Sequence, residues 1–205
     1  MLIGDSIRLG YQGRVAELLG DGVQIFAPGE NCRYSKFTLW GMFSWVDSFG
    51  NPKIDAAQFN AGIWDLHRCT ADGEIFTPIA EYADTIRRLG IQMQSYTKNV
   101  IFANIIPGNH NLDDSYNTFN PLINTDPGYK KVHLTVPMAE WNSDVARYNA
   151  AAEAEMAKLG IPVNDMYSAI IADPEKYISG DGIHPTGEGY ELLAQMTAAR
   201  IEEML

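Results

Sequence analysis

The chain contains few cysteines and few basic residues. Its two cysteines, Cys32 and Cys69, are too few for a disulfide framework. We expect two free thiols, with a single bridge between them as the alternative. Lys and Arg number 15 against 26 Asp and Glu, and the net charge is −11. Because nucleic acids and anionic membrane surfaces are bound by basic faces, we expect no nucleic-acid partner.

Long apolar runs and cofactor motifs are also absent from the sequence. No run approaches the roughly 18 apolar residues of a membrane span, and no secretory signal precedes the first motif described below. We expect a cytoplasmic protein, or a secreted or periplasmic one if a leader has been removed. Glycine-rich phosphate loops are missing. His67, His110 and His133 lack the spacing of metal ligands, so we expect no cofactor and no metal.

The order of predicted elements indicates the fold class. Apolar runs predict strands at residues 1–3, 23–27, 54–60, 99–106 and 161–164, and helical periodicity predicts helices at 6–19, 37–48, 77–94, about 141–159 and from Thr186 to about Leu205. Strands alternate with helices and no hairpin signal separates them. The sequence therefore predicts one domain, residues 1–205, with a three-layer α/β/α architecture around a mainly parallel sheet.

Two short motifs near the ends of the chain carry the chemistry. A Gly-Asp-Ser tripeptide ends at Ser6, and the block Asp-Gly-Ile-His-Pro begins at Asp181. Serine is a poor nucleophile unless a base, itself oriented by a carboxylate, lies beside it. Asp181 and His184 are three residues apart, so one turn of chain can place both on the same side. We predict a catalytic Ser6, His184 and Asp181. A helix-capping role for Ser6 is the alternative, and the two roles are compatible.

The candidate residues fall where an open α/β sheet places its binding sites, beyond the carboxyl ends of the strands. Ser6 follows the first predicted strand, Asn31 the second and residues 60–65 the third, while His184 precedes the last helix. Four separate loops are therefore expected to converge on one edge of the sheet.

The first and last blocks resemble those of the SGNH/GDSL hydrolase family. The last block extends this resemblance through Pro185, Gly187, Gly189 and Tyr190. The resemblance covers essentially the whole chain. It implies a flavodoxin-like fold and ester hydrolysis by a Ser-His-Asp triad without a cofactor.

The middle blocks depart from the family pattern. Where the family has an asparagine in its third block, this chain has Trp64, within the sequence Phe-Asn-Ala-Gly-Ile-Trp-Asp that begins at residue 59. We predict that Asn60 replaces the missing oxyanion donor, with the tying down of a loop as the alternative. In the second block either Gly29 or Asn31 can replace the usual glycine, and Asn31 is preferred. With Ser6 these groups would form the oxyanion hole.

The substrate is predicted from the polar character of residues 109–136, a long stretch without a steady period. Such a loop suits a hydroxylated substrate, and we expect Gly29, Trp64 and His110 to contact it. An O-acetylated carbohydrate is the preferred substrate. A lysophospholipid or a general carboxylic ester is the alternative, as is a non-catalytic carbohydrate-binding role. The aromatic residues Trp40, Phe43 and Trp45 suit core or lid packing better than a sugar platform.

Overall fold

The computed structural model describes residues 1–70, 72–109 and 136–205. In these residues a central sheet contains β1 (Leu2–Ile3), β2 (Ala57–Phe59), β3 (Val100–Ala103) and β4 (Val163–Asn164). The strands lie in the order β1-β2-β3-β4 and are all parallel. The predicted parallel sheet is therefore confirmed.

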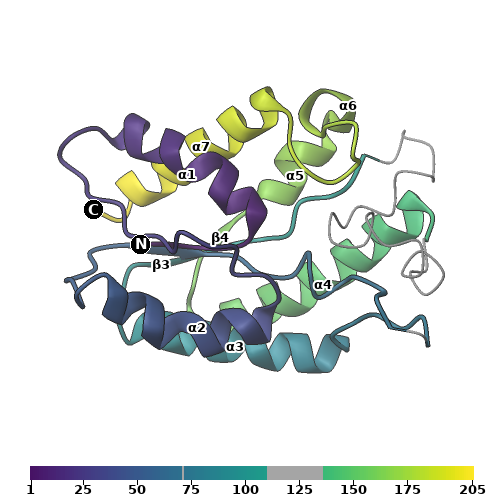
Figure 1. Ribbon diagram of the computed structural model, residues 1–205, viewed down its shortest axis with the longest axis horizontal. Coiled ribbons are helices and arrows are strands. Elements are labelled where there is room, and N and C mark those ends of the chain that lie inside the picture. The colour runs from purple at the N-terminus through teal and green to yellow at the C-terminus, as the bar shows by residue number, and fades with distance from the viewer. Residues whose placement is uncertain (71, 110–135) are drawn as a thin grey trace.

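Helices cover both faces of the sheet (Figure 1). On one face α1 (Ser6–Leu19) packs against α7 (Gly187–Glu202), beside the short helices α5 (Met166–Ile171) and α6 (Pro174–Tyr177). On the other face lie α2 (Ser35–Ser48), α3 (Ile79–Gln94) and α4 (Met138–Leu159), and α3 packs against both of its neighbours. The predicted three-layer α/β/α architecture is confirmed.

The strands are mainly apolar because both faces of the sheet are covered by helices, and the two polar side chains among them, Gln58 and Asn164, bond to each other at 2.9 Å. All four residues of β3 are buried, with no more than 2% of any of them exposed. Phe59 on β2 and Phe102 on β3 are register partners, and their ring centroids lie 5.3 Å apart. This packing fixes the carboxyl ends of β2 and β3 side by side.

Local signals set the ends of the helices. Gly160 ends α4 in the left-handed conformation, with φ of 69°, as a glycine at this position favours. The last helix begins at the expected position, because Thr186 caps α7 by accepting a hydrogen bond of 3.1 Å at Oγ1 from the Gly189 N–H.

One prediction about secondary structure was wrong, and two short helices were not predicted. Residues 23–27 form no regular strand, and a single backbone bond of 2.9 Å from the Leu2 N–H to Phe26 O joins them to β1. The segment is half-exposed and ends at Pro28, which has no N–H to donate to a ladder. Helices α5 and α6 were not predicted, because a helix of one or two turns is too short to show an apolar period.

Three further findings concern cysteines, membrane spans and the long polar stretch. Cys32 and Cys69 are both free, as predicted. In the described parts of the chain, no helix combines the length and the apolar character that a membrane crossing needs. Residues 110–135, and with them most of the predicted polar loop and His110 and His133, lie outside the described residues.

Candidate active site

Ser6, His184 and Asp181 lie in one hydrogen-bonded line. The Ser6 Oγ is 2.9 Å from His184 Nε2, and His184 Nδ1 is 2.8 Å from Asp181 Oδ2. Ser6 follows β1 directly, and the other two residues belong to the loop before α7. The fold thus joins the two end motifs of the sequence. The side chains of His184 and Asp181 are 23% and 25% exposed, so the pair is reachable from solvent.

The Asp181 carboxylate is held by several donors. Its Oδ1 accepts hydrogen bonds from the Ser179 hydroxyl and from the N–H groups of Ile183 and His184, at 3.0, 2.9 and 2.8 Å. Burial on its own would raise the pKa of Asp181, but the bonds from the His184 ring and the two N–H groups outweigh burial and lower the pKa to about 2. Gly182, with φ of 81°, makes the turn that brings these donors around one oxygen.

The ionised state of Asp181 determines the tautomer of His184. An ionised carboxylate only accepts hydrogen bonds, so the His184 Nδ1 carries the hydrogen of the 2.8 Å bond to Asp181. In the neutral imidazole the Nε2 lone pair then faces the Ser6 hydroxyl, 2.9 Å away. The Ser6 O–H donates to Nε2, which is the direction that proton removal from serine needs.

Asp5, rather than Ser6, is the N-cap of α1. Its Oδ1 accepts a bond of 2.9 Å from the Ile7 N–H, so Ser6 is the first helical residue and its hydroxyl bonds to His184 instead. Asp5 is fully buried, and its Oδ2 has no hydrogen-bond partner among the described residues. Burial raises the pKa of Asp5 to about 6, although the Ile7 N–H and the nearby His184 and Arg8 act in the opposite direction.

Asn60 lies at the carboxyl end of β2, beside the serine loop. Its N–H donates to Ile3 O at 2.9 Å, and its side-chain Oδ1 packs against Gly4, two residues before Ser6. The side chain is buried, and Oδ1 has no hydrogen-bond partner within the described residues. The alternative role for Asn60 was to hold a loop in place. Its Oδ1 does not do this by hydrogen bonding, because it accepts no bond from the described residues.

The loop of residues 28–32 lies beside the serine loop. The Cys32 N–H donates to Gly4 O at 3.2 Å. The Asn31 side-chain oxygen accepts a bond of 2.8 Å from the Arg33 N–H, and Gly29 is exposed. The structure therefore places both second-block candidates, Gly29 and Asn31, on a loop anchored next to Ser6.

The rest of the third block is built into the core. Gly62 has φ of 146°, and a Cβ there would overlap Ile105 and Tyr82, so the position requires glycine. Asp65 is fully buried and accepts bonds of 2.8 and 2.6 Å from the Ser35 N–H and hydroxyl. These contacts attach the start of α2 to the block that follows β2.

Trp64 and His67 lie near one another after β2. Trp64 is half-buried against the core, and its ring centroid is 5.9 Å from that of His67. His67 in turn meets the Trp141 ring edge to face, at 5.5 Å.

In residues 1–70, 72–109 and 136–205, no three His, Cys, Asp or Glu side chains gather as metal ligands would.

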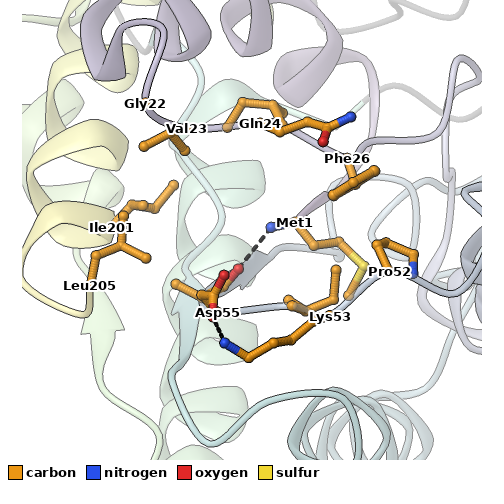
Figure 2. Close-up of a pocket in the computed structure, with 13 residues that line it drawn as sticks. Met1, Gly22, Val23, Gln24, Phe26, Pro52, Lys53, Asp55, Ile201 and Leu205 are labelled. Atoms are coloured by element: carbon orange, nitrogen blue, oxygen red, sulfur yellow. Dashed lines mark hydrogen bonds and ion pairs between the residues drawn. The ribbon is translucent and has the colours of Figure 1, made fainter.

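A separate pocket of about 350 Å³ lies at the other end of β1 and β2. Figure 2 shows its lining, in which the Met1 amino group donates to Ala56 O at 2.7 Å and the Lys53 Nζ lies 2.6 Å from Asp55 Oδ1. The pocket contains none of the predicted site residues. It adjoins the amino ends of the strands, away from Ser6.

Arg8 is a residue near the site that the sequence analysis missed. Only 1% of it is exposed, although it belongs to the helix that begins with Ser6. The signal was present in the sequence, because Arg8 is three residues before Tyr11 and seven before Val15, on the buried face of α1. An arginine on an apolar helical face indicates a buried charge with specific partners.

Comparisons with solved structures agree with this architecture. A GDSL-like lipase from Bacteroides thetaiotaomicron matches with a TM-score of 0.69 at 19% identity, over 100% of this chain and 87% of that one. The acetyl xylan esterase AlAXEase matches with a TM-score of 0.71 at 17% identity, over 98% of both chains. An acetylxylan esterase from Geobacillus stearothermophilus matches with a TM-score of 0.69 at 17% identity, over 98% of this chain and 92% of that one.

These likenesses show that the chain has the fold of GDSL-type hydrolases. No protein-family model matches the sequence, and no curated protein matches it.

Proposed function

We propose that the protein is a serine hydrolase that cleaves a small ester through Ser6, His184 and Asp181. The observation that carries the proposal is the continuous line of bonds, 2.9 Å from Ser6 to His184 and 2.8 Å from His184 to Asp181. A serine at a helix start and a histidine before another helix have no structural need to meet. Their contact supplies what a serine nucleophile requires, an adjacent and oriented base.

The reaction follows from the direction of these hydrogen bonds. Ser6 Oγ attacks the ester carbonyl while its proton passes to His184 Nε2, and the ionised Asp181 stabilises the imidazolium that forms. His184 then gives this proton to the departing alkoxide, which leaves as an alcohol. Water, deprotonated by His184, attacks the acyl-serine, and release of the carboxylic acid restores Ser6.

The tetrahedral intermediate needs donors for its oxyanion. The Ser6 N–H, at the first position of α1, is one of the N–H groups that a helix start leaves without an intrahelical partner. We assign the other donors to the Asn60 amide and to the loop that carries Gly29 and Asn31. The placement of Asn60 against Gly4 supports this assignment, because Gly4 belongs to the same loop as Ser6.

For the substrate we propose an O-acetyl group on a carbohydrate. The acetylxylan esterases among the structural neighbours support this proposal. The core packing expected of the α2 aromatic residues holds for Trp45, which is buried and donates to Glu30 Oε1 at 2.9 Å, but not for Trp40 and Phe43, which are 78% and 70% exposed. Trp64 and Gly29 remain proposed substrate contacts, and His110 lies outside the described residues.

A longer acyl ester is the second candidate. It is favoured by the GDSL-like lipase among the structural neighbours. A non-catalytic sugar-binding role is disfavoured, since binding alone gives no reason for the Ser6–His184–Asp181 bonds.

A labelling and substrate experiment tests the proposal. The protein is treated with a fluorophosphonate probe, and it is assayed with acetylated xylo-oligosaccharides and with p-nitrophenyl esters of two to twelve carbons. We expect labelling at Ser6, with the highest kcat/KM on acetyl groups. A steady rise of kcat/KM with chain length would favour the longer acyl ester. Absence of both labelling and turnover would overturn the hydrolase proposal.

A further inference from the structure

Arg8 is a buried cation whose hydrogen bonds go chiefly to main-chain carbonyls. Its Nε and Nη2 donate to Gly4 O at 3.2 and 3.0 Å, and its Nη1 donates to Pro28 O at 2.7 Å. Nη2 also donates to Glu30 O at 2.7 Å. Gln12 Oε1 and Cys32 Sγ, at 2.5 and 3.6 Å, complete the set. None of the ion pairs among the described residues includes the Arg8 guanidinium. The buried Asp5 carboxylate nevertheless attracts the Arg8 charge electrostatically.

These bonds join two loops of the proposed oxyanion hole. Gly4 O belongs to the loop that leads to Ser6, and Pro28 O and Glu30 O lie on either side of Gly29. Apart from Arg8, the Cys32 N–H to Gly4 O bond of 3.2 Å is the backbone contact between these loops in the described structure. The guanidinium therefore fixes the distance between the nucleophile loop and the 28–32 loop.

The same bonds fix the direction of two N–H groups. The described peptide bonds contain no cis form, and in a trans peptide the C=O and the next N–H point in opposite directions. Because Pro28 O points at the guanidinium, the Gly29 N–H points away from it. Glu30 O also points at the guanidinium, so the Asn31 N–H likewise points away from it. Both N–H groups are thus directed away from the buried cation.

We propose that Arg8 is a positioning residue for the oxyanion hole, one that aims the N–H groups of Gly29 and Asn31 by holding the carbonyls that precede them. The inference rests on the proposed ester hydrolysis. Arg8 itself would not contact the reacting atoms. A planar group with five donors suits the task, because it bonds three carbonyls in different directions at once, whereas a lysine ammonium is a single point charge.

The test compares Arg8→Lys with Arg14→Lys. Arg14 is the matched control, because it lies on the same helix, is exposed and, among the described residues, bonds only to Glu17 and Glu191. Lysine keeps the charge and the apolar stem, so we expect Arg8→Lys to fold, as judged by circular dichroism. The concentration of competent sites is titrated to its end point with a fluorophosphonate, and kcat and KM for p-nitrophenyl acetate are expressed per titrated site.

We expect Arg8→Lys to lower kcat per site by about 10- to 100-fold with KM changed less than about threefold, since misplaced oxyanion donors affect mainly the transition state. Labelling should slow in parallel, and Arg14→Lys should match the unsubstituted protein. A merely structural role would lower the number of titrated sites and leave kcat per site unchanged, which would overturn the assignment.

A second measurement does not depend on turnover. In ¹⁵N-labelled protein the amide signals of Gly29 and Asn31 should shift or broaden in Arg8→Lys and not in Arg14→Lys. Unchanged amide signals in a folded Arg8→Lys would also overturn the assignment. If the unsubstituted protein neither labels nor hydrolyses any ester, the proposed function fails, whereas normal hydrolysis that Arg8→Lys leaves intact defeats only the role of Arg8.

Discussion

Gly4 and Asn60 are in contact at the carboxyl ends of neighbouring strands. They follow the register pair Ile3 and Phe59, and the Asn60 side-chain oxygen occupies the space that a Cβ on Gly4 would need. The same Cβ would lie 2.8 Å from the Cβ of Arg8. The Gly-Asp-Ser motif therefore begins with glycine because two buried side chains close over it.

We predict that Gly4→Ala lowers both stability and activity, because the added methyl must displace Asn60 or Arg8, neither of which is at the end of an exposed, flexible chain. Overpacking of this kind costs about 1–3 kcal/mol. Gly13→Ala is the control, since a Cβ there meets nothing within 4 Å in α1 and a helical Gly→Ala change is neutral or stabilising. Urea unfolding and esterase assays check both variants. A Gly4→Ala protein as stable and active as Gly13→Ala would contradict the packing described.

Replacing the two bonded residues should show that Ser6 and His184 act as one unit. Ser6→Ala and His184→Ala should each abolish turnover, and the double variant should be no worse than either, because members of a triad are non-additive. Since Asp5 caps α1, Ser6→Ala should change unfolding free energy by no more than about 0.5 kcal/mol. Strictly additive losses in the double variant would argue for separate mechanisms.

Asn60→Ala tests the proposed oxyanion donor. It should lower kcat by roughly 10²- to 10³-fold and change KM little, because such a donor acts mainly in the transition state. Asn149→Ala is the matched control: it is another buried asparagine, whose amide bonds the Ile105 N–H and C=O at 2.8 Å each, so its loss should lower stability and spare kcat. Both are measured per titrated site. If Asn60→Ala behaves like Asn149→Ala, the oxyanion hole uses other donors.

Asp5 should make the protein less stable as the pH rises. Its pKa is raised from 3.8 to about 6 in the folded state, so the folded protein holds this proton more tightly and loses that advantage as the pH rises through about 6. Asp5→Asn keeps an oxygen that can cap the Ile7 N–H and cannot ionise. Relative to the unsubstituted protein it should gain up to about 3 kcal/mol at pH 8 and little at pH 4.

Urea unfolding at both pH values measures this difference, with Asp21→Asn, an exposed aspartate after α1, as the control for loss of one charge. If the stability of Asp5→Asn follows the same pH dependence as that of Asp21→Asn, the pKa of Asp5 is not raised in the folded protein.

The sequence by itself determined the features whose causes are local. The period of apolar residues predicted α1, α3 and α4, and the threonine before α7 and the glycine after α4 marked helix ends. The alternation of strands and helices predicted the parallel sheet, because parallel strands need crossover connections. The end motifs singled out Ser6, Asp181 and His184, since a turn of three residues is enough to join Asp181 to His184.

Only the tertiary structure decided which distant groups meet. The Ser6–His184 distance depends on α1 packing beside α7, and the Gly4–Asn60 contact depends on the register of β1 with β2. The burial of Arg8 requires residues 28–30 to turn their carbonyls toward α1, and residues 23–27 fail to form a strand although their composition favours one. In each case the energy comes from groups far apart in the chain, which no local pattern of residues records.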